Sequence, residues 1–156
     1  MTQDATFEDG RERPLNLGAQ DTDDLRVISS LVQDAIFPIT EMQWQARQHR
    51  FAILLNRFRW EDAARDRHAP ERVQSLLVID NVVAVSSQGI DRGENDLILS
   101  VLAIEFTAGE ESAGDLVLTL AGDGALRLQI EALDITLKDV TRPYVAPSGK
   151  TPDHPE

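Results

Sequence analysis

Residues 116–130 read LVLTLAGDGALRLQI, with Leu or Ile at each even position of both arms and glycine-rich residues between the arms. An apolar residue at every second position is typical of a strand that buries one face, so this stretch predicts a β-hairpin. Both arms must bury the same face, so even positions pair with even positions. We predict a loop over residues 122–124 with Gly124 left-handed, because a two-residue turn would place Leu118 opposite Gln129.

The β pattern continues on both sides of this hairpin. After it, the apolar positions change from even to odd numbers, which predicts a β-bulge near Glu131 and Ala132. Before it, residues 75–87 and 97–106 are rich in β-branched residues and apolar at odd and even positions alike. We expect these two segments to be strands that are buried on both faces, in a sheet that is covered on each side.

A second hairpin is expected over residues 41–60. The apolar residues of its two arms are Met42, Trp44 and Ala46, followed by Phe51, Ile53 and Leu55. Directly opposed residues share a face, so we predict that Ala46 pairs with Phe51 and that residues 47–50 form the loop.

One clear helix precedes these strands. Asp21 is a favoured N-cap residue, and the apolar residues that follow it recur at spacings of three and four. The helix must end before Pro38, because the residue before a proline disfavours the α conformation. We therefore predict a helix over residues 21–34.

Together these elements predict one α+β domain over residues 14–140. Its fold is a curved, mainly antiparallel sheet of about six to seven strands with one N-terminal helix packed on it. Residues 1–13 are polar and residues 141–156 hold four of the seven prolines. We expect a disordered N-terminal tail and a Pro-rich C-terminal tail, because neither segment offers enough apolar surface to offset the entropy of ordering.

Composition excludes several classes of function. There is no cysteine, which rules out disulfides, thiolate metal sites and a cysteine nucleophile. The net charge of −12 opposes loose binding to nucleic acid or anionic lipid, since both require Lys and Arg to neutralise phosphate. No signal peptide or membrane-spanning stretch is recognised, so we expect a cytoplasmic protein with nucleic acid and membranes unlikely as partners.

No catalytic, cofactor or metal signature is found. The chain has three histidines with no helical spacing between them, two lysines, and no phosphate-binding glycine loop. The acidic cluster of Asp91, Glu94 and Asp96 does not match a calcium loop and indicates a solvated turn. We therefore expect no metal, no cofactor and no catalytic residue, which favours a protein that is not an enzyme.

The least ordinary feature is an Arg-rich stretch. Residues 47–72 contain seven Arg and four acidic residues, a charge of +3, whereas the rest of the chain carries −15. Arginine and aromatic side chains suit anionic or planar groups. The candidate ligand- or partner-binding residues are Trp44, Arg47, Arg50, Arg57, Arg59 and Trp60. The alternative is a solvated strand end and loop whose arginines balance acidic residues elsewhere.

Four stretches carry a resemblance to a known family. They are LNLGAQDTDDLRVISSLVQDAI (15–36), RFAILLNRFRWE (50–61), VVAVSSQGIDR followed by LSVLAIEF, and GALRLQIEALDITLKDV (124–140). The chain resembles an uncharacterised, mainly alphaproteobacterial domain-of-unknown-function family, number two-nine-four-eight. The resemblance implies a short cytoplasmic bacterial protein without an established activity, and it assigns no role to any residue.

Two hypotheses of function follow. The first is a non-enzymatic cytosolic interaction protein that binds another protein or forms a homodimer, since catalytic signatures are missing. The alternative is a domain or enzyme that binds a small anionic molecule, with a pocket inside the curved sheet and Arg side chains on a carboxylate or phosphate. RNA binding through the Arg-rich stretch ranks last, because the net charge opposes it.

Overall fold

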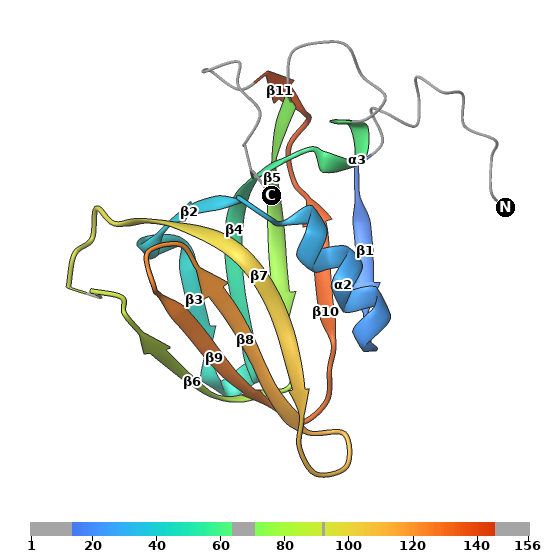
Figure 1. Ribbon diagram of the computed structural model, residues 1–156, viewed down its shortest axis with the longest axis vertical. Coiled ribbons are helices and arrows are strands. Elements are labelled where there is room, and N and C mark those ends of the chain that lie inside the picture. Colours follow the sequence, from blue (N-terminus) through green and yellow to red (C-terminus); the bar gives the residue numbers. More distant parts are fainter. Residues whose placement is uncertain (1–13, 64–70, 92, 146–156) are drawn as a thin grey trace, which may run out of the picture.

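An antiparallel sheet of eleven strands dominates the computed structural model, which describes residues 14–63, 71–91 and 93–145 (Figure 1). The strands are β1 (Asn16–Ala19), β2 (Ile36–Pro38), β3 (Met42–Gln45), β4 (Arg50–Phe58), β5 (Glu71–Ile79), β6 (Val82–Gln88), β7 (Ile98–Ala108), β8 (Gly114–Leu120), β9 (Ala125–Ile130), β10 (Ile135–Asp139) and β11 (Tyr144–Val145). The helical elements are α2 (Thr22–Leu31), α3 (Trp60–Ala63) and the 3₁₀ turns η1 (Ile39–Glu41) and η2 (Ala46–Gln48). The α+β class with a mainly antiparallel sheet is confirmed, but the sheet has more strands than the six to seven expected.

The strands follow the order β1-β10-β5-β4-β2-β7-β8-β9-β6, while β3 adds to β4 and β11 adds to β5. The sheet curls around one apolar core, with β7, β8 and β9 opposite β4, β5 and β10 (Figure 1). Short strand β2 joins the two halves, because Ile36 is paired with both Asn56 of β4 and Ser100 of β7. The sheet is not closed, since the end strands β1 and β6 are not paired with each other.

Helix α2 packs beside β1 and β7 and covers part of the gap between them (Figure 1). The predicted N-cap is confirmed, because the Asp24 N–H donates to Asp21 Oδ1 at 2.8 Å. The apolar stripe through Leu25 and Ile28 faces the core. The helix ends at Leu31, earlier than predicted, and the chain then turns through a left-handed Asp34 (φ 65°) into β2.

Replacing Asp21 with alanine should lower the free energy of unfolding by about 1 kcal/mol, because the Asp24 N–H loses its acceptor. Asp23→Ala is the matched control, since the Asp23 carboxylate only forms an exposed ion pair with Arg26 and should cost a few tenths of a kcal/mol, about 0.3. Chemical denaturation measures both variants. Equal midpoints for the two would show that the cap does not stabilise the helix.

The C-terminal hairpin has the predicted parity. Leu118 lies opposite Leu126, so even positions pair with even positions and the alternative register with Gln129 is excluded. The prediction for the turn was wrong in detail. The Leu120 N–H donates to the Gly124 carbonyl, so Gly124 already belongs to the second arm, and the left-handed residues are Gly122 and Asp123.

Two glycines with positive φ offer a test of how closely the loops pack. Gly89 (φ 68°) and Gly122 (φ 79°) both have a left-handed backbone conformation, which favours glycine. Only at Gly89 would an added Cβ meet the Asp123 carbonyl oxygen, at 2.5 Å. Gly122→Ala should therefore cost about 1–2 kcal/mol for the left-handed backbone alone. Gly89→Ala should cost about 1–3 kcal/mol more, because backbone atoms must move apart. Thermal and chemical denaturation measure the loss of unfolding free energy in both variants. Equal losses would contradict the predicted close contact at Gly89.

The first hairpin has the predicted face but not the predicted register. Trp44, rather than Ala46, lies opposite Phe51, and Met42 lies opposite Ile53. Ala46 instead begins the turn η2, which ends at a left-handed His49 (φ 54°). The longer turn shifts the pairing by two residues, which leaves each side chain on its expected face.

The apolar segments 75–87 and 97–106 are not buried on both faces, so this prediction was wrong. The first segment divides into β5 and β6 at a left-handed Asn81. Inward-facing residues are buried, but outward-facing Val83 and Ile98 are 47% and 56% exposed. In the described residues no helix or strand covers the outer face of the sheet across β5, β4 and β2.

Two boundaries also differ from the sequence-based expectation. The change of parity after Ile130 comes from the end of β9 and the start of β10, rather than from a bulge at residues 131–132. Part of the expected C-terminal tail joins the fold, because Tyr144 pairs with Arg72 of β5. The expected N-terminal tail, 1–13, lies outside the described residues.

Candidate functional site

The structure divides the predicted site residues between the two ends of β4. Trp44 and Arg47 lie at the turn where β4 begins, together with Arg50. Arg57 lies near the other end of the strand, and Arg59 and Trp60 follow it. Arg57 lies seven positions after Arg50 on β4, a span of about 23 Å, so the six residues do not surround one small-molecule site.

Arg57 is buried in an ion-pair cluster, and the prediction that it could be a solvated residue was wrong. Its side chain has no exposed surface. Its guanidinium donates to Glu61 in a bidentate pair, with both N···O distances 2.8 Å, and to Asp139 Oδ1 at 3.0 Å. Ser75 completes the cluster, because its hydroxyl accepts from Arg57 Nε at 2.9 Å and donates to Asp139 Oδ1 at 2.6 Å.

The cluster ties four elements together. Arg57 comes from β4, Ser75 from β5 and Asp139 from β10, while Glu61 comes from α3. Asp139 Oδ2 also accepts from the Leu15 N–H at 2.9 Å, which connects the residue before β1. This arrangement satisfies the guanidinium from within the fold, so we assign the cluster a structural role.

Charge and burial act in opposite directions on the cluster. Burial would raise the pKa of the Glu61 carboxyl, but its hydrogen bonds to Arg57 and the positive charges of Arg57 and Arg59 outweigh burial and lower that pKa. Burial likewise disfavours the charged form of Arg57, yet the bonds and charges of Glu61 and Asp139 raise the pKa of its guanidinium. The Glu61 carboxyl and the Arg57 guanidinium are therefore charged at neutral pH.

Arg59 and Trp60 also make internal contacts. Arg59 is almost fully buried and donates to Glu71 Oε1 at 2.7 Å. The Trp60 indole N–H donates to the Gln33 carbonyl at 2.8 Å, and its ring packs edge-on against Phe58. These contacts connect the end of β4 with β5 and the residues after α2.

The turn end of β4 is more accessible. The Trp44 side chain is 38% exposed, and Arg47 is exposed on η2 with no carboxylate paired to it among the described residues. Arg50 is paired with Asp80 at 2.8 Å. Trp44 and Arg47 are thus the predicted residues that remain available to a partner.

Trp44 lines an apolar slot between β3 and β6. The slot has a volume of about 210 Å³ and is lined by Met42, Trp44, Phe51, Val85, Ser87, Ile90 and Leu126. Both flanking strands are edge strands, because among the described strands β3 pairs only with β4 and β6 only with β9. The strands meet at one end, where the Val82 N–H donates to the His49 carbonyl at 2.9 Å. The slot is therefore a gap in the wall of the curled sheet that is closed at the turn.

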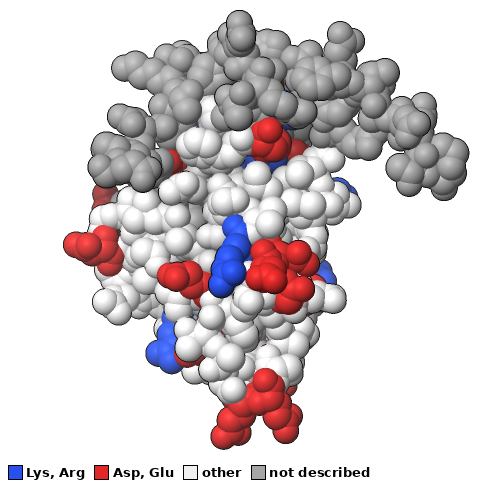
Figure 2. Space-filling model, turned by 45° about the vertical axis from the view of Figure 1, so that its right-hand side comes forward, with Lys and Arg blue, Asp and Glu red and all other residues white. Residues whose placement is uncertain are grey.

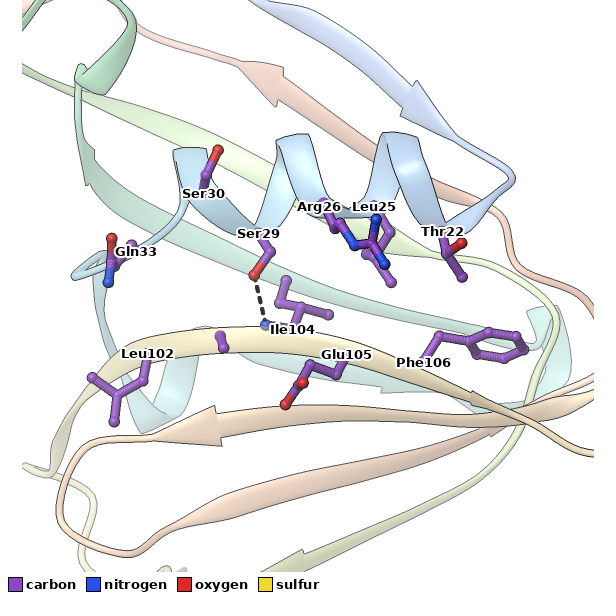
Figure 3. A pocket seen from close by; sticks show the side chains of 11 residues that line it. Thr22, Leu25, Arg26, Ser29, Ser30, Gln33, Leu102, Ile104, Glu105 and Phe106 are labelled. Carbon is purple, nitrogen blue, oxygen red and sulfur yellow. Dashed lines mark hydrogen bonds between the residues drawn. The ribbon is translucent and has the colours of Figure 1, made fainter.

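A larger cleft of about 560 Å³ lies between α2 and β7. Its helix wall is mainly polar, with Thr22, Arg26, Ser29 and Ser30 beside the apolar Leu25, and Gln33 follows the helix. In Figure 3 the Ser29 hydroxyl reaches down to β7, where it accepts from the Ile104 N–H at 2.9 Å, while Leu102 and Glu105 point away from the helix. This bond crosses the middle of the cleft, and Arg26 is paired with Asp23.

Surface charge adds no strong site on the face that includes α2. In Figure 2 the central basic side chains lie beside acidic ones, and much of the face between the charged groups is uncharged. Among the described residues, no group of three or more His, Asp or Glu side chains could hold a metal ion. No described helix has the length and apolar character needed to cross a membrane.

Comparison with known proteins gives a family and no activity. The family model described as a protein of unknown function, DUF2948, matches residues 15–154. The chain belongs to this family. No curated protein and no solved structure matches this DUF2948 chain.

Most residues of the slot were not among the predicted site residues. Trp44 alone was named, whereas Val85 and Ser87 belong to segment 75–87, which was expected to be a strand buried on both faces, and Ile90 was given no role. The alternation of inward- and outward-facing residues along this segment does not indicate that its strand borders a gap in the sheet. Only the folded structure shows that the edge strands β3 and β6 line opposite sides of one slot.

Proposed function

We propose that this DUF2948 protein is a non-enzymatic interaction protein that binds an extended peptide segment in the slot between β3 and β6. The observation that carries the proposal is a pair of unpaired strand edges on either side of an apolar slot. A strand that enters such a gap gains main-chain hydrogen bonds from the edges and buries alternate side chains.

The sheet register identifies which peptide groups face the slot. The Leu120 N–H donates to the Gly124 carbonyl, so the peptide groups of even residues in β8 and β9 hydrogen-bond to each other. The peptide groups of odd residues in β9 therefore point toward β6. Since Ala84 and Ser86 lie opposite odd residues of β9, the peptide groups of Val85 and Ser87 point away from β9.

The same alternation applies to β3. The Gln74 carbonyl of β5 accepts from the Val140 N–H, so the peptide groups of even residues in β5 point toward β10. The peptide groups of odd residues in β5 point toward β4. The peptide groups of even residues in β4 therefore point toward β3, where Gln43 lies opposite Ala52. The peptide group of Trp44 then points away from β4 and toward the slot.

The chemistry of the slot defines the peptide. Six of its seven lining residues are apolar, and its volume of about 210 Å³ is smaller than the roughly 300–1,000 Å³ of pockets that hold whole small molecules. It suits an apolar side chain of a peptide whose backbone lies along β3 and β6. Arg47 lies beyond the closed end of the slot, so an acidic residue at that end of the peptide would be favoured.

A displayed library of random dodecapeptides tests the proposal. We expect enrichment of peptides with apolar residues at alternating positions next to an acidic residue. A selected peptide should quench or shift the fluorescence of Trp44, read in a Trp60→Phe background where Trp44 is the single tryptophan. N-methylation of alternate backbone nitrogens should abolish binding, because it removes the donors that pair with an edge.

Matched variants on β6 locate the peptide. Val85→Arg should weaken binding at least tenfold, because Val85 lines the slot, whereas Val83→Arg should change it less than twofold, because Val83 faces outward. Arg47→Ala should weaken binding more at low salt than at high salt. Failure of the library to enrich any sequence, or equal effects of the two valine variants, would refute the site.

The second candidate is a domain for a small anionic ligand, and the α2–β7 cleft favours it. Its volume of about 560 Å³ is within the range of ligand pockets, and its helix wall offers three hydroxyls and the Arg26 guanidinium. A panel of carboxylates and phosphate esters should then raise the melting temperature of the wild type, but not of Arg26→Ala. No shift across the panel would remove this candidate.

A further inference from the structure

The outer face of the sheet is an apolar surface that no described helix or strand covers. Outward-facing residues alternate with the core residues of β4 and β5, so that Leu54 lies opposite Leu76 and Ala52 opposite Val78. All four remain partly exposed. The surface extends through β2 to β7, where Ile36 and Ile98 are 40% and 56% exposed.

This surface, here called the outer face, is defined by Ile36, Ala52, Leu54, Leu76, Val78 and Ile98. No described helix or strand packs over it. Contiguous apolar surfaces of this kind mark sites of association, because water is released when they are covered.

The central positions of the outer face carry no charge, although the chain as a whole is strongly acidic. The chain carries 27 Asp and Glu and has a net charge of −12. Yet the outward positions 52–56 of β4, 74–78 of β5 and 36–38 of β2 include no charged residue. The margins carry Lys138, Arg72, and the ion pair between Arg50 and Asp80.

We propose that a second copy of this chain packs on the outer face to form a two-fold symmetric dimer. Two chains of net charge −12 repel each other where their carboxylates meet. The outer face lets them approach without bringing unpaired carboxylates together. In a two-fold dimer the face meets itself, so the same uncharged side chains lie on both sides of the interface.

The contact takes the form of two sheets packed face to face. Sheets in such an arrangement lie about 10 Å apart and interdigitate their side chains. The paired rows Leu54–Leu76 and Ala52–Val78 give each copy a ridge of apolar side chains. The uncovered face of β4 and β5 then becomes the second buried face of these strands.

Sedimentation equilibrium of the full chain tests the dimer. The wild type should sediment as a dimer at micromolar concentration and dissociate on dilution. Leu54→Glu and Leu76→Glu should each shift the dissociation constant at least a hundredfold toward the monomer, because carboxylates would face each other across the axis. Val83→Glu is the matched control, since Val83 is 47% exposed on β6 away from the outer face, and it should leave the dimer intact.

Crosslinking gives a readout that does not depend on the stability of a charged variant. The chain has no cysteine, so a single Gln74→Cys on the outer face can be joined to its copy by a short bismaleimide. We expect a covalent dimer, whereas Val27→Cys on α2 should remain a monomer. A wild type that is monomeric up to millimolar concentration, or equal crosslinking of the two variants, would overturn the proposal. The peptide site between β3 and β6 is tested separately, so either proposal can fail alone.

Discussion

Replacing Arg57 with methionine should lower the free energy of unfolding by about 3–5 kcal/mol, because the removal of one member of a buried ion pair leaves its partners without compensation. Asp139, whose side chain is 3% exposed, would lose its positive partner and keep only Ser75 and the Leu15 N–H as donors. Glu61 would lose both hydrogen bonds of its bidentate pair. Chemical denaturation at pH 7 measures the loss.

The same substitution at Arg50 is the control. Arg50 forms a single ion pair with Asp80, and both side chains are partly exposed, so Arg50→Met should cost less than about 1 kcal/mol. The two arginines belong to the same strand and to the same Arg-rich stretch. If Arg57→Met were as stable as Arg50→Met, the cluster would not hold the end of β4 in place.

The contribution of Glu61 should depend on pH in a defined direction. The pKa of its carboxyl is lowered in the fold, because the hydrogen bonds and charge of Arg57 outweigh burial, which acts to raise it. A lowered pKa contributes stability that is present above the unfolded value of about 4.3 and is lost as the pH falls through the folded value. The difference in stability between wild type and Glu61→Gln should therefore be largest near pH 7 and shrink below about pH 4. A difference that grows on acidification would contradict this sign.

Replacing Phe37 with alanine should cost about 3–5 kcal/mol. Phe37 is fully buried at the centre of β2, the three-residue strand that joins β4 to β7. Its loss would open a cavity where the two halves of the sheet meet. Hydrogen exchange should show loss of protection in β2 and in the adjoining part of β7 before other strands open.

Neighbouring residues on β2 provide the control. Ile36→Ala removes an apolar side chain from the same strand, but Ile36 is 40% exposed, so its cost should stay below about 1 kcal/mol. Phe37→Leu should recover most of the loss, because it restores much of the buried volume. Similar costs for Phe37→Ala and Ile36→Ala would show that β2 does not carry the junction.

Local patterns determined several elements of the fold. The alternation in residues 116–130 required even positions to pair, and Leu118 does lie opposite Leu126. Asp21 was recognisable as an N-cap, because a carboxylate before a helical apolar stripe can accept a backbone N–H only within the first turn. Both inferences concern residues that interact over a short span of sequence.

Interactions between distant residues were not visible in the sequence. Arg57 appeared to share an Arg-rich surface with Arg47, but its partner Asp139 lies 82 residues away. Whether an arginine is solvated or buried depends on that partner, because a buried guanidinium is stable only when carboxylates compensate it.

The sequence by itself determined the alternation of inward and outward side chains, since a strand repeats every two residues wherever it lies. Only the tertiary structure decided which strands became edges and which outward faces stayed uncovered in the described part of the chain. The curl of the sheet brings the edge strands β3 and β6 to either side of one slot, and no described helix or strand covers the row of Leu54 and Leu76. Both proposed binding surfaces follow from this arrangement, because a free edge and an uncovered face are properties of neighbours that are far apart in the chain.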